Sequence, residues 1–178
     1  KVNLKFFPEG GNLVKGVPSQ VAFEATDAYG NPITLFGRII NRRKEEIGHF
    51  ATIHEGRGVF TYIPTGEDAD KAEVELGGKK YRFDLPEVRS QGYVLHVDNL
   101  TSEDSIAVSV QKNTYTPSNL LGLAVIAHGK LLNSCLLNVG KNTPVSFKLD
   151  KSEWTPGVVQ LVLFDTAGPV SYTHLTLP

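Results

Sequence analysis

Residues 71–85 read KAEVELGGKKYRFDL, and this stretch decides the class of the fold. Residues 71–76 and 80–85 alternate polar and apolar side chains, which is the two-residue period of a half-buried strand. Gly77-Gly78 stands between them, and such a pair is typical of the two-residue turn that joins antiparallel strands. The stretch therefore predicts a β-hairpin and, with it, antiparallel β-structure.

The same period continues toward the N-terminus. Val21, Phe23 and Ala25 alternate with polar neighbours, and this strand stops at the turn formers of residues 27–32. Further strands are predicted at residues 2–7, 35–40, 47–54 and 58–63, the last two as a hairpin closed by residues 55–58. Seven short strands with regularly spaced turns are typical of one immunoglobulin-like sandwich.

The pattern restarts after residues 85–92, which have the composition of a linker. Strands are predicted at residues 93–97, 106–110, 120–128, 130–137, 145–149 and 158–164, and no segment has a convincing helical period. Residues 1–90 hold 13 basic and 13 acidic side chains, which leaves 5 and 6 of the totals of 18 and 19 for the remainder. We therefore predict an all-β protein of two tandem antiparallel β-sandwiches, residues 1–87 and 88–169.

Composition excludes several classes of partner. The formal net charge of -1 does not favour nucleic acid or an anionic membrane. No run is long and apolar enough to span a bilayer, so direct membrane insertion is not expected. Cys135 is the single cysteine, so no internal disulfide is possible. Because the chain opens inside a strand pattern without a leader, we expect it to be an internal fragment.

Several turns and core positions carry a family resemblance. They are FFPEGGNLV (residues 6–14), VPSQVAF (17–23), DAYGNP (27–32), GRGVF (56–60), GVVQL (157–161) and LFD (163–165). Together they resemble the macroglobulin-type domains of large Gram-negative cell-envelope proteins, in the alpha-2-macroglobulin-like group. The resemblance implies two macroglobulin-like sandwiches that act as a non-catalytic scaffold.

The resemblance also implies surroundings for the chain. The expected location is extracytoplasmic, in the periplasm or at the outer-membrane surface. The expected partners are neighbouring domains of the same polypeptide and other envelope proteins. An alternative that follows from the family is a part of a protease-inhibiting macroglobulin. The thioester of such proteins is not expected here, because Cys135 has no Gly before it and no Glu-Gln after it.

The last nine residues, VSYTHLTLP (residues 170–178), carry a second resemblance. They look like a translated transposon-end sequencing adapter. This implies that the tail has no evolved structure and that the second sandwich lacks its final strand. An unpaired edge is then expected beside residues 158–164.

Catalytic, metal and cofactor residues are not predicted. His49 and His54 are five residues apart, so an unbroken strand would place them on opposite faces, where they cannot share one ion. The acidic residues 67–70 lack the alternate ligand spacing of a calcium loop. Alternation places Cys135 toward the core, where a thiol is inert packing. We therefore expect no enzyme.

A binding function is the second hypothesis. Tyr115 and Trp154 are aromatic residues in polar loops next to proline, unlike the aromatic residues in strand phase. With Asn119 they are predicted to form a carbohydrate- or protein-binding cluster at one end of the second sandwich.

Overall fold

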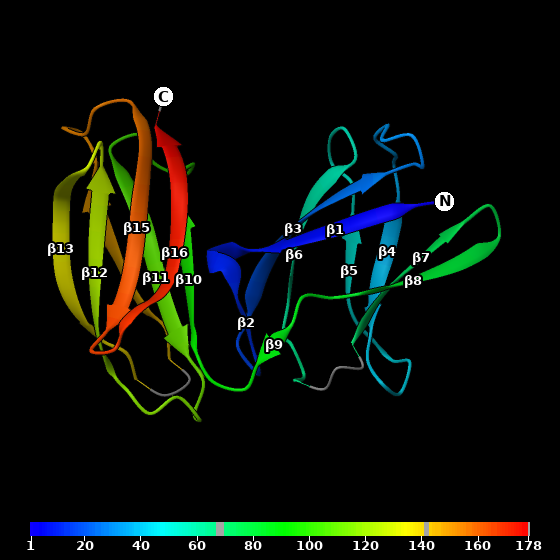
Figure 1. Cartoon of the computed structure of the whole chain (residues 1–178), viewed down its shortest axis with the longest axis horizontal. Helices are drawn as coiled ribbons and strands as arrows, with labels where there is room; N and C mark the ends of the chain where they lie inside the picture. Colours follow the sequence, from blue (N-terminus) through cyan, green and yellow to red (C-terminus); the bar gives the residue numbers. More distant parts are fainter. Residues whose placement is uncertain (67–69, 141–142, 178) are drawn as a thin grey trace. The chain divides into compact units, whose positions relative to one another are not determined.

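The computed structural model describes residues 1–66, 70–140 and 143–177 and forms two compact units, Lys1–Arg89 and Ser90–Pro178 (Figure 1). Strands account for nearly all the regular structure, so the all-β prediction is confirmed. The helical element described is one 3₁₀ turn, η1 (Glu9–Gly11). Within the described residues, no helix is long and apolar enough to cross a membrane.

The N-terminal unit has two antiparallel sheets, ordered β1-β3-β6 and β5-β4-β7-β8 (Figure 1). The short strands β2 and β9 form an additional parallel pair. The strands are β1 (Asn3–Pro8), β2 (Leu13–Val14), β3 (Ser19–Thr26), β4 (Phe36–Ile40), β5 (Glu46–Ala51), β6 (Arg57–Tyr62), β7 (Lys71–Leu76), β8 (Lys79–Asp84) and β9 (Val88–Arg89).

The hairpin predicted from residues 71–85 is present. Leu76 pairs with Lys79, so the connection has two residues, and both glycines have positive φ (58° for Gly77 and 75° for Gly78). Two positive φ angles define the turn whose twist matches that of the flanking strands, and glycine adopts them without strain.

The second predicted hairpin is wrong in its pairing. His54 forms an isolated bridge with Arg57 around a tight turn, but β5 then pairs with β4, whereas β6 pairs with β3. The chain therefore crosses from one sheet to the other. The local turn signal was correct, but the packing of two apolar strand faces against each other decides which strands become neighbours.

The core of the N-terminal unit is built on aromatic rings. Phe23 in β3 is 2% exposed, and its ring centroid lies 5.0 Å from Phe50 and 6.1 Å from Phe60. Neighbouring glycines make room for these rings. A Cβ on Gly37 would lie 2.3 Å from Phe50, and one on Gly58 would lie 2.6 Å from Phe23.

An ion-pair network covers the outward side of β5-β4-β7-β8. Arg38 donates to Glu73 Oε1 at 3.0 Å and 2.6 Å, and Arg82 Nε donates to Glu73 Oε2 at 2.9 Å. These hydrogen bonds, that of Arg38 first, hold the pKa of the Glu73 carboxyl below its usual range. The outward face of this sheet is therefore polar.

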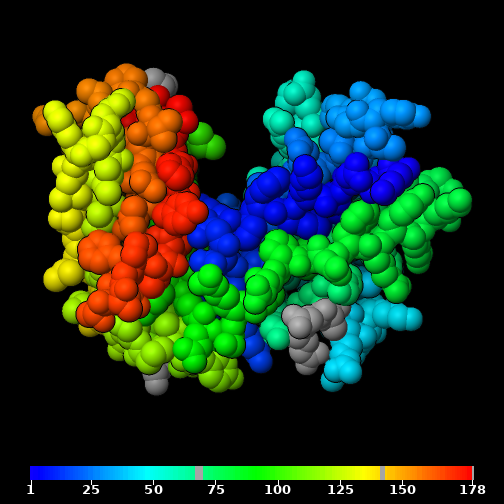
Figure 2. All heavy atoms as spheres, viewed as in Figure 1, coloured from blue at the N-terminus to red at the C-terminus, as the bar shows by residue number. Residues whose placement is uncertain are grey.

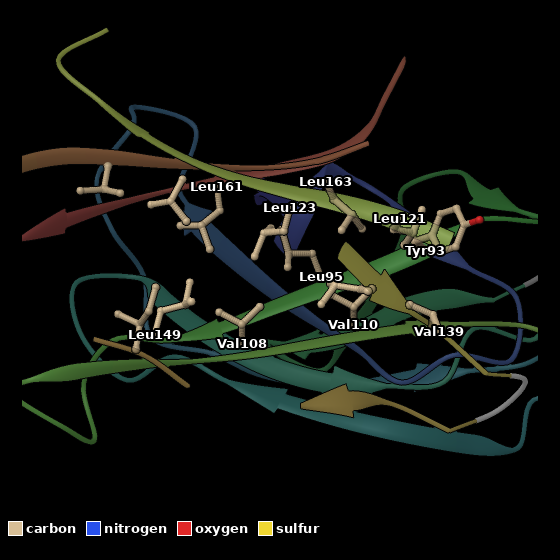
Figure 3. Packing of buried hydrophobic residues seen from close by; sticks show 14 of the residues in the cluster. Tyr93, Leu95, Val108, Val110, Leu121, Leu123, Val139, Leu149, Leu161 and Leu163 are labelled. Atoms are coloured by element: carbon tan, nitrogen blue, oxygen red, sulfur yellow. The ribbon is translucent and has the colours of Figure 1, made fainter. Parts of the chain in front are cut away.

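The C-terminal unit has sheets ordered β10-β11-β14 and β13-β12-β15-β16. Its strands are β10 (Tyr93–Asp98), β11 (Ser105–Lys112), β12 (Leu120–Ala127), β13 (Lys130–Asn138), β14 (Val145–Asp150), β15 (Gly157–Asp165) and β16 (Gly168–Leu177). Figure 3 shows leucines of β12 and β15, such as Leu123 and Leu161, above Val108 and Leu149 of the opposite sheet. The interdigitating layers form an aliphatic core.

The boundary between the units lies after Arg89, two residues beyond the predicted position. Val88 pairs with Leu13 and Arg89 with Val14, so β9 belongs to the N-terminal unit. The predicted linker had no strand signal because a two-residue strand is too short to show a period.

The prediction of an unpaired edge beside β15 is wrong in this structure. β16 pairs antiparallel with β15 from Asp165↔Gly168 to Gly157↔Leu177. Leu177 is buried, and Leu175 and Val170 pack against the core. The tail alternates inward and outward side chains, which is sufficient for it to complete the sheet whatever its origin. The adapter origin stays a prediction.

Candidate functional site

The predicted cluster of Tyr115, Asn119 and Trp154 is not brought together. Tyr115 and Asn119 follow the end of β11, whereas Trp154 follows β14, whose Asp150 pairs with Ser105 at the start of β11. An eight-residue strand spans about 26 Å, so Trp154 lies at the opposite end of the sandwich. Antiparallel pairing places the loops after neighbouring strands at opposite ends, which loop composition alone does not reveal. Ligand binding at these residues stays a prediction.

Trp154 lines a hollow of about 780 Å³ at one end of the C-terminal unit, called here the Trp154 hollow. Its walls come from the loop after β10, the turn after β14 and the end of β16. The lining residues are Asn99, Leu100, Ser102, Glu103, Asp104, Lys151, Ser152, Trp154, Thr176 and Leu177.

A buried lysine joins the first two of these walls. Lys151 is 9% exposed, and its ammonium donates to Asn99 Oδ1 at 2.8 Å and to the Asn99 carbonyl at 3.3 Å. Its backbone N–H also donates to the Asp104 carbonyl at 2.8 Å. A charged group can be buried when it is hydrogen-bonded in this way, so Lys151 sets the geometry of the hollow.

Two aspartates shape the loops beside Lys151. Asp98 accepts hydrogen bonds from the hydroxyl and N–H of Thr101 and from the N–H of Leu100, and these lower its pKa. Asp150 accepts from the hydroxyl and N–H of Ser152, which lowers its pKa as well. The first turn presents Leu100, which is 95% exposed, at the mouth of the hollow. The site thus combines an apolar side chain, an indole and polar groups, a set suited to a sugar or a peptide.

A second hollow lies on the outward side of β1-β3-β6. It has a volume of about 600 Å³, and its lining residues are Phe7, Ala22, Phe23, Glu24, Ile53, His54, Arg57, Gly58 and Val59. Its walls are mainly apolar, and the guanidinium of Arg57 lies 3.2 Å from Glu24 Oε1. We call it the Phe7 hollow.

A buried polar network at the start of the C-terminal unit has no counterpart in the sequence analysis. Lys112 is almost fully buried and donates to the Thr116 carbonyl at 2.6 Å. The Thr116 hydroxyl accepts from the Gly92 N–H at 2.8 Å, and Asn113 Nδ2 donates to the Ser90 carbonyl at 2.7 Å. The sequence signal for this network was Lys112, in phase with the inward residues of a predicted strand and followed by Asn113, Thr116 and Pro117. The network holds Ser90 and Gly92, at the start of the unit, against the loop that follows β11.

The remaining candidates do not form a catalytic or metal site among the described residues. No group of three His, Cys, Asp or Glu there could hold a metal ion. Cys135 packs against the core as predicted, and burial raises the pKa of its thiol. The acidic turn at residues 67–69 lies outside the described residues, while Asp70 accepts hydrogen bonds from the Thr65 N–H at 3.0 Å and hydroxyl at 2.9 Å.

Comparisons with known proteins give likenesses of structure alone. No protein-family model and no curated protein matches this sequence. Among solved structures, native alpha-2-macroglobulin of E. coli is similar at 14% identity and a TM-score of 0.35, over 99% of this chain and 14% of that one. The BSP domain of a biofilm-associated protein is similar at 11% identity and a TM-score of 0.37, over 99% of this chain and 29% of that one. The chain therefore spans less than a third of either protein.

Proposed function

We propose that the chain is a non-catalytic structural part of a larger, extracytoplasmic envelope protein of the alpha-2-macroglobulin-like type. Its two units serve as spacers between neighbouring domains of the same polypeptide, and its outer surfaces contact other envelope proteins rather than nucleic acid. The sequence resemblance to macroglobulin-type domains supports this class. The observation that carries the spacer role is the connection between the units.

The connection has no free linker. The carbonyl of Arg89 accepts a hydrogen bond from the Lys15 N–H at 2.9 Å, within the N-terminal unit. The carbonyl of the next residue, Ser90, accepts from Asn113 Nδ2 within the C-terminal unit. Adjacent residues are thus hydrogen-bonded within different units, so no run of unbonded residues stands between the two. A connection without such a run suits a spacer better than a long flexible linker would.

Trypsin offers a direct test, because Arg89–Ser90 is a tryptic bond. We expect this bond to resist cleavage in the native protein, since proteolysis requires the segment to open. Asn113→Ala removes the hydrogen bond to Ser90 and the one that Asn113 Oδ1 accepts from the Thr116 hydroxyl. It is expected to accelerate cleavage after Arg89 by at least about fivefold, as for the loss of roughly 1 kcal/mol. Mass spectrometry of timed digests measures both rates.

A matched control removes a side-chain hydrogen bond far from the connection. Asn3→Ala deletes the bond from Asn3 Nδ2 to the Asp27 carbonyl and is expected to leave cleavage after Arg89 unchanged. If Arg89–Ser90 were among the first bonds cut in the unaltered chain, the connection would be a flexible linker and the spacer role would fail.

A carbohydrate- or protein-binding module is the alternative, and the Trp154 hollow favours it. Trp154 is the only tryptophan of the chain, so its fluorescence reports on this hollow directly. If the alternative holds, titration with a panel of oligosaccharides and peptides shifts the emission, and Leu100→Ala weakens binding by about tenfold, the cost of losing one buried apolar side chain. Ile63→Ala, which changes an exposed apolar residue of the N-terminal unit, serves as the control. If no member of the panel shifts the emission, the binding alternative is wrong and the spacer role remains.

A further inference from the structure

Among the described residues, the outward face of the sheet β13-β12-β15-β16 presents no Lys, Arg, Asp or Glu, and its β16 edge carries Tyr172 and His174. Strand alternation and register place the following residues outward: Leu120, Gly122, Ala124 and Ile126 of β12, Leu131, Ser134, Leu136 and Asn138 of β13, and Val158, Gln160, Val162 and Phe164 of β15. We call this set the apolar face. Figure 2 shows β13 in yellow and β15 in orange on one exposed side of this unit.

The other three outward sheet faces all carry charge. β4 and β7 bear Arg38 and Glu73, β3 and β6 bear Glu24 and Arg57, and β14 bears Lys148. Charged side chains keep an exposed sheet face soluble and separate. The absence of charged side chains from one of the four outward faces indicates that this face is a contact surface.

The exposed apolar side chains of this face supply more than half of the surface that a standard protein interface needs. Its large side chains remain exposed by 38% to 73%, and they are Leu120, Leu131, Leu136, Val158 and Phe164. Side chains with such exposure present on the order of 500 Å² of apolar surface, the size of the largest patch on a typical monomer. This is more than half of the roughly 800 Å² that each partner contributes to a standard interface, and the polar rim supplies more.

The relief of the face suits a second copy of itself. Leu136, Gly122 and Phe164 form one row across the strands, and Phe164 lies over Gly122, where a Cβ would be 2.2 Å from Cζ. The next row across β13 and β12 holds the small residues Ser134 and Ala124.

Leu131 and Ile126 form a third, larger row beyond the small one. Over β13 and β12 the small residues thus form a trough between two ridges, which Val162 of β15 closes at one side. Successive rows lie about 7 Å apart. Under a two-fold rotation, a ridge of each copy enters the trough of the other.

We propose that the apolar face is the contact surface of a symmetric homodimer, in which the two faces stack as in a β-sandwich. An uncharged surface offers nothing to a charged peptide or a nucleic acid, whereas an isologous contact needs only self-complementary shape. The sheets would lie about 10 Å apart, with Leu136 of each copy in the partner's trough. The contact is centred on β12 and β13, and it adds lateral pairing to the spacer role without depending on that role.

Sedimentation equilibrium of the full chain tests the dimer. We expect a monomer–dimer equilibrium for the unaltered chain, and Leu136→Arg is expected to raise the dimer dissociation constant at least thirtyfold by burying an unpaired charge at the centre of the contact. Val59→Arg, on the outward face of β6, is the matched control and is expected to leave association unchanged. Circular dichroism confirms that both variants fold.

Cross-linking provides a second readout. Ser134→Cys in a Cys135→Ser background places a thiol in each trough, across the two-fold axis from its counterpart and with the sheets about 10 Å apart. It is expected to give a cross-linked dimer with a bismaleimide that spans about this distance, whereas Ser109→Cys, on the outward face of β11, is not. A chain that stays monomeric at several hundred micromolar overturns the proposal. A dimer that survives Leu136→Arg, or one that Val59→Arg dissociates, assigns association to another surface and overturns it too.

Discussion

A chain that ends at Asp165 is expected to lose most of the stability of its C-terminal unit. The truncation removes β16, uncovers the whole of β15 and deletes Leu177, Leu175 and Val170 from the core. Burial of one leucine contributes about 1.5 to 3 kcal/mol, so the combined loss is on the order of 5 kcal/mol. A loss of that size matches the entire stability of many domains. Hydrogen exchange with mass spectrometry would show lost protection in β12 and β15, while peptides of the N-terminal unit stay protected.

Two double variants separate packing from mere strand length. Leu175→Asn with Leu177→Asn removes the inward apolar groups and is expected to approach the effect of truncation. Tyr172→Thr with His174→Thr changes outward residues and is expected to cost less than about 1 kcal/mol. If the truncated chain unfolded in urea like the full one, the tail would have no structural role. The expectation of an adapter-derived tail without evolved structure would then stand.

The second large effect is expected at the centre of the N-terminal unit. Phe23→Ala empties a site surrounded by Phe50 and Phe60 and is expected to cost about 3 to 5 kcal/mol. Gly37 and Gly58 already lie against these rings, so the backbone has little freedom to collapse into the cavity. Urea unfolding followed by hydrogen exchange of N-terminal peptides measures the cost without interference from the other unit.

Phe7→Ala is the matched control, because it removes the same side chain from the outward face of the neighbouring strand. Phe7 is half exposed and lines the Phe7 hollow, so its loss is expected to cost about 1 kcal/mol or less. Equal costs for the two variants would mean that the aromatic cluster does not form the core of this unit.

The candidate site shows what sequence reasoning reached and what it missed. Loop composition identified Trp154, which lines the Trp154 hollow, yet it placed Tyr115 at the same end of the sandwich. The buried ammonium of Lys151 was missed because a lysine in a polar turn has the composition of a solvent-exposed residue. Its partner, Asn99, is 52 residues away in the chain, and only folding brings the two together.

Local chemistry in the sequence alone determined the strands and several turns of this protein. The alternation of polar and apolar side chains in β3 and β7 predicts strands, because successive side chains of an extended backbone point to opposite faces. Gly77-Gly78 determines a turn because glycine alone tolerates those two φ angles cheaply. Tertiary structure decided which strands became neighbours, as for β5, β6 and β16, because that choice depends on burying whole faces against one another. It also decided which residues share an end of the sandwich and which sheet face remained apolar and uncovered.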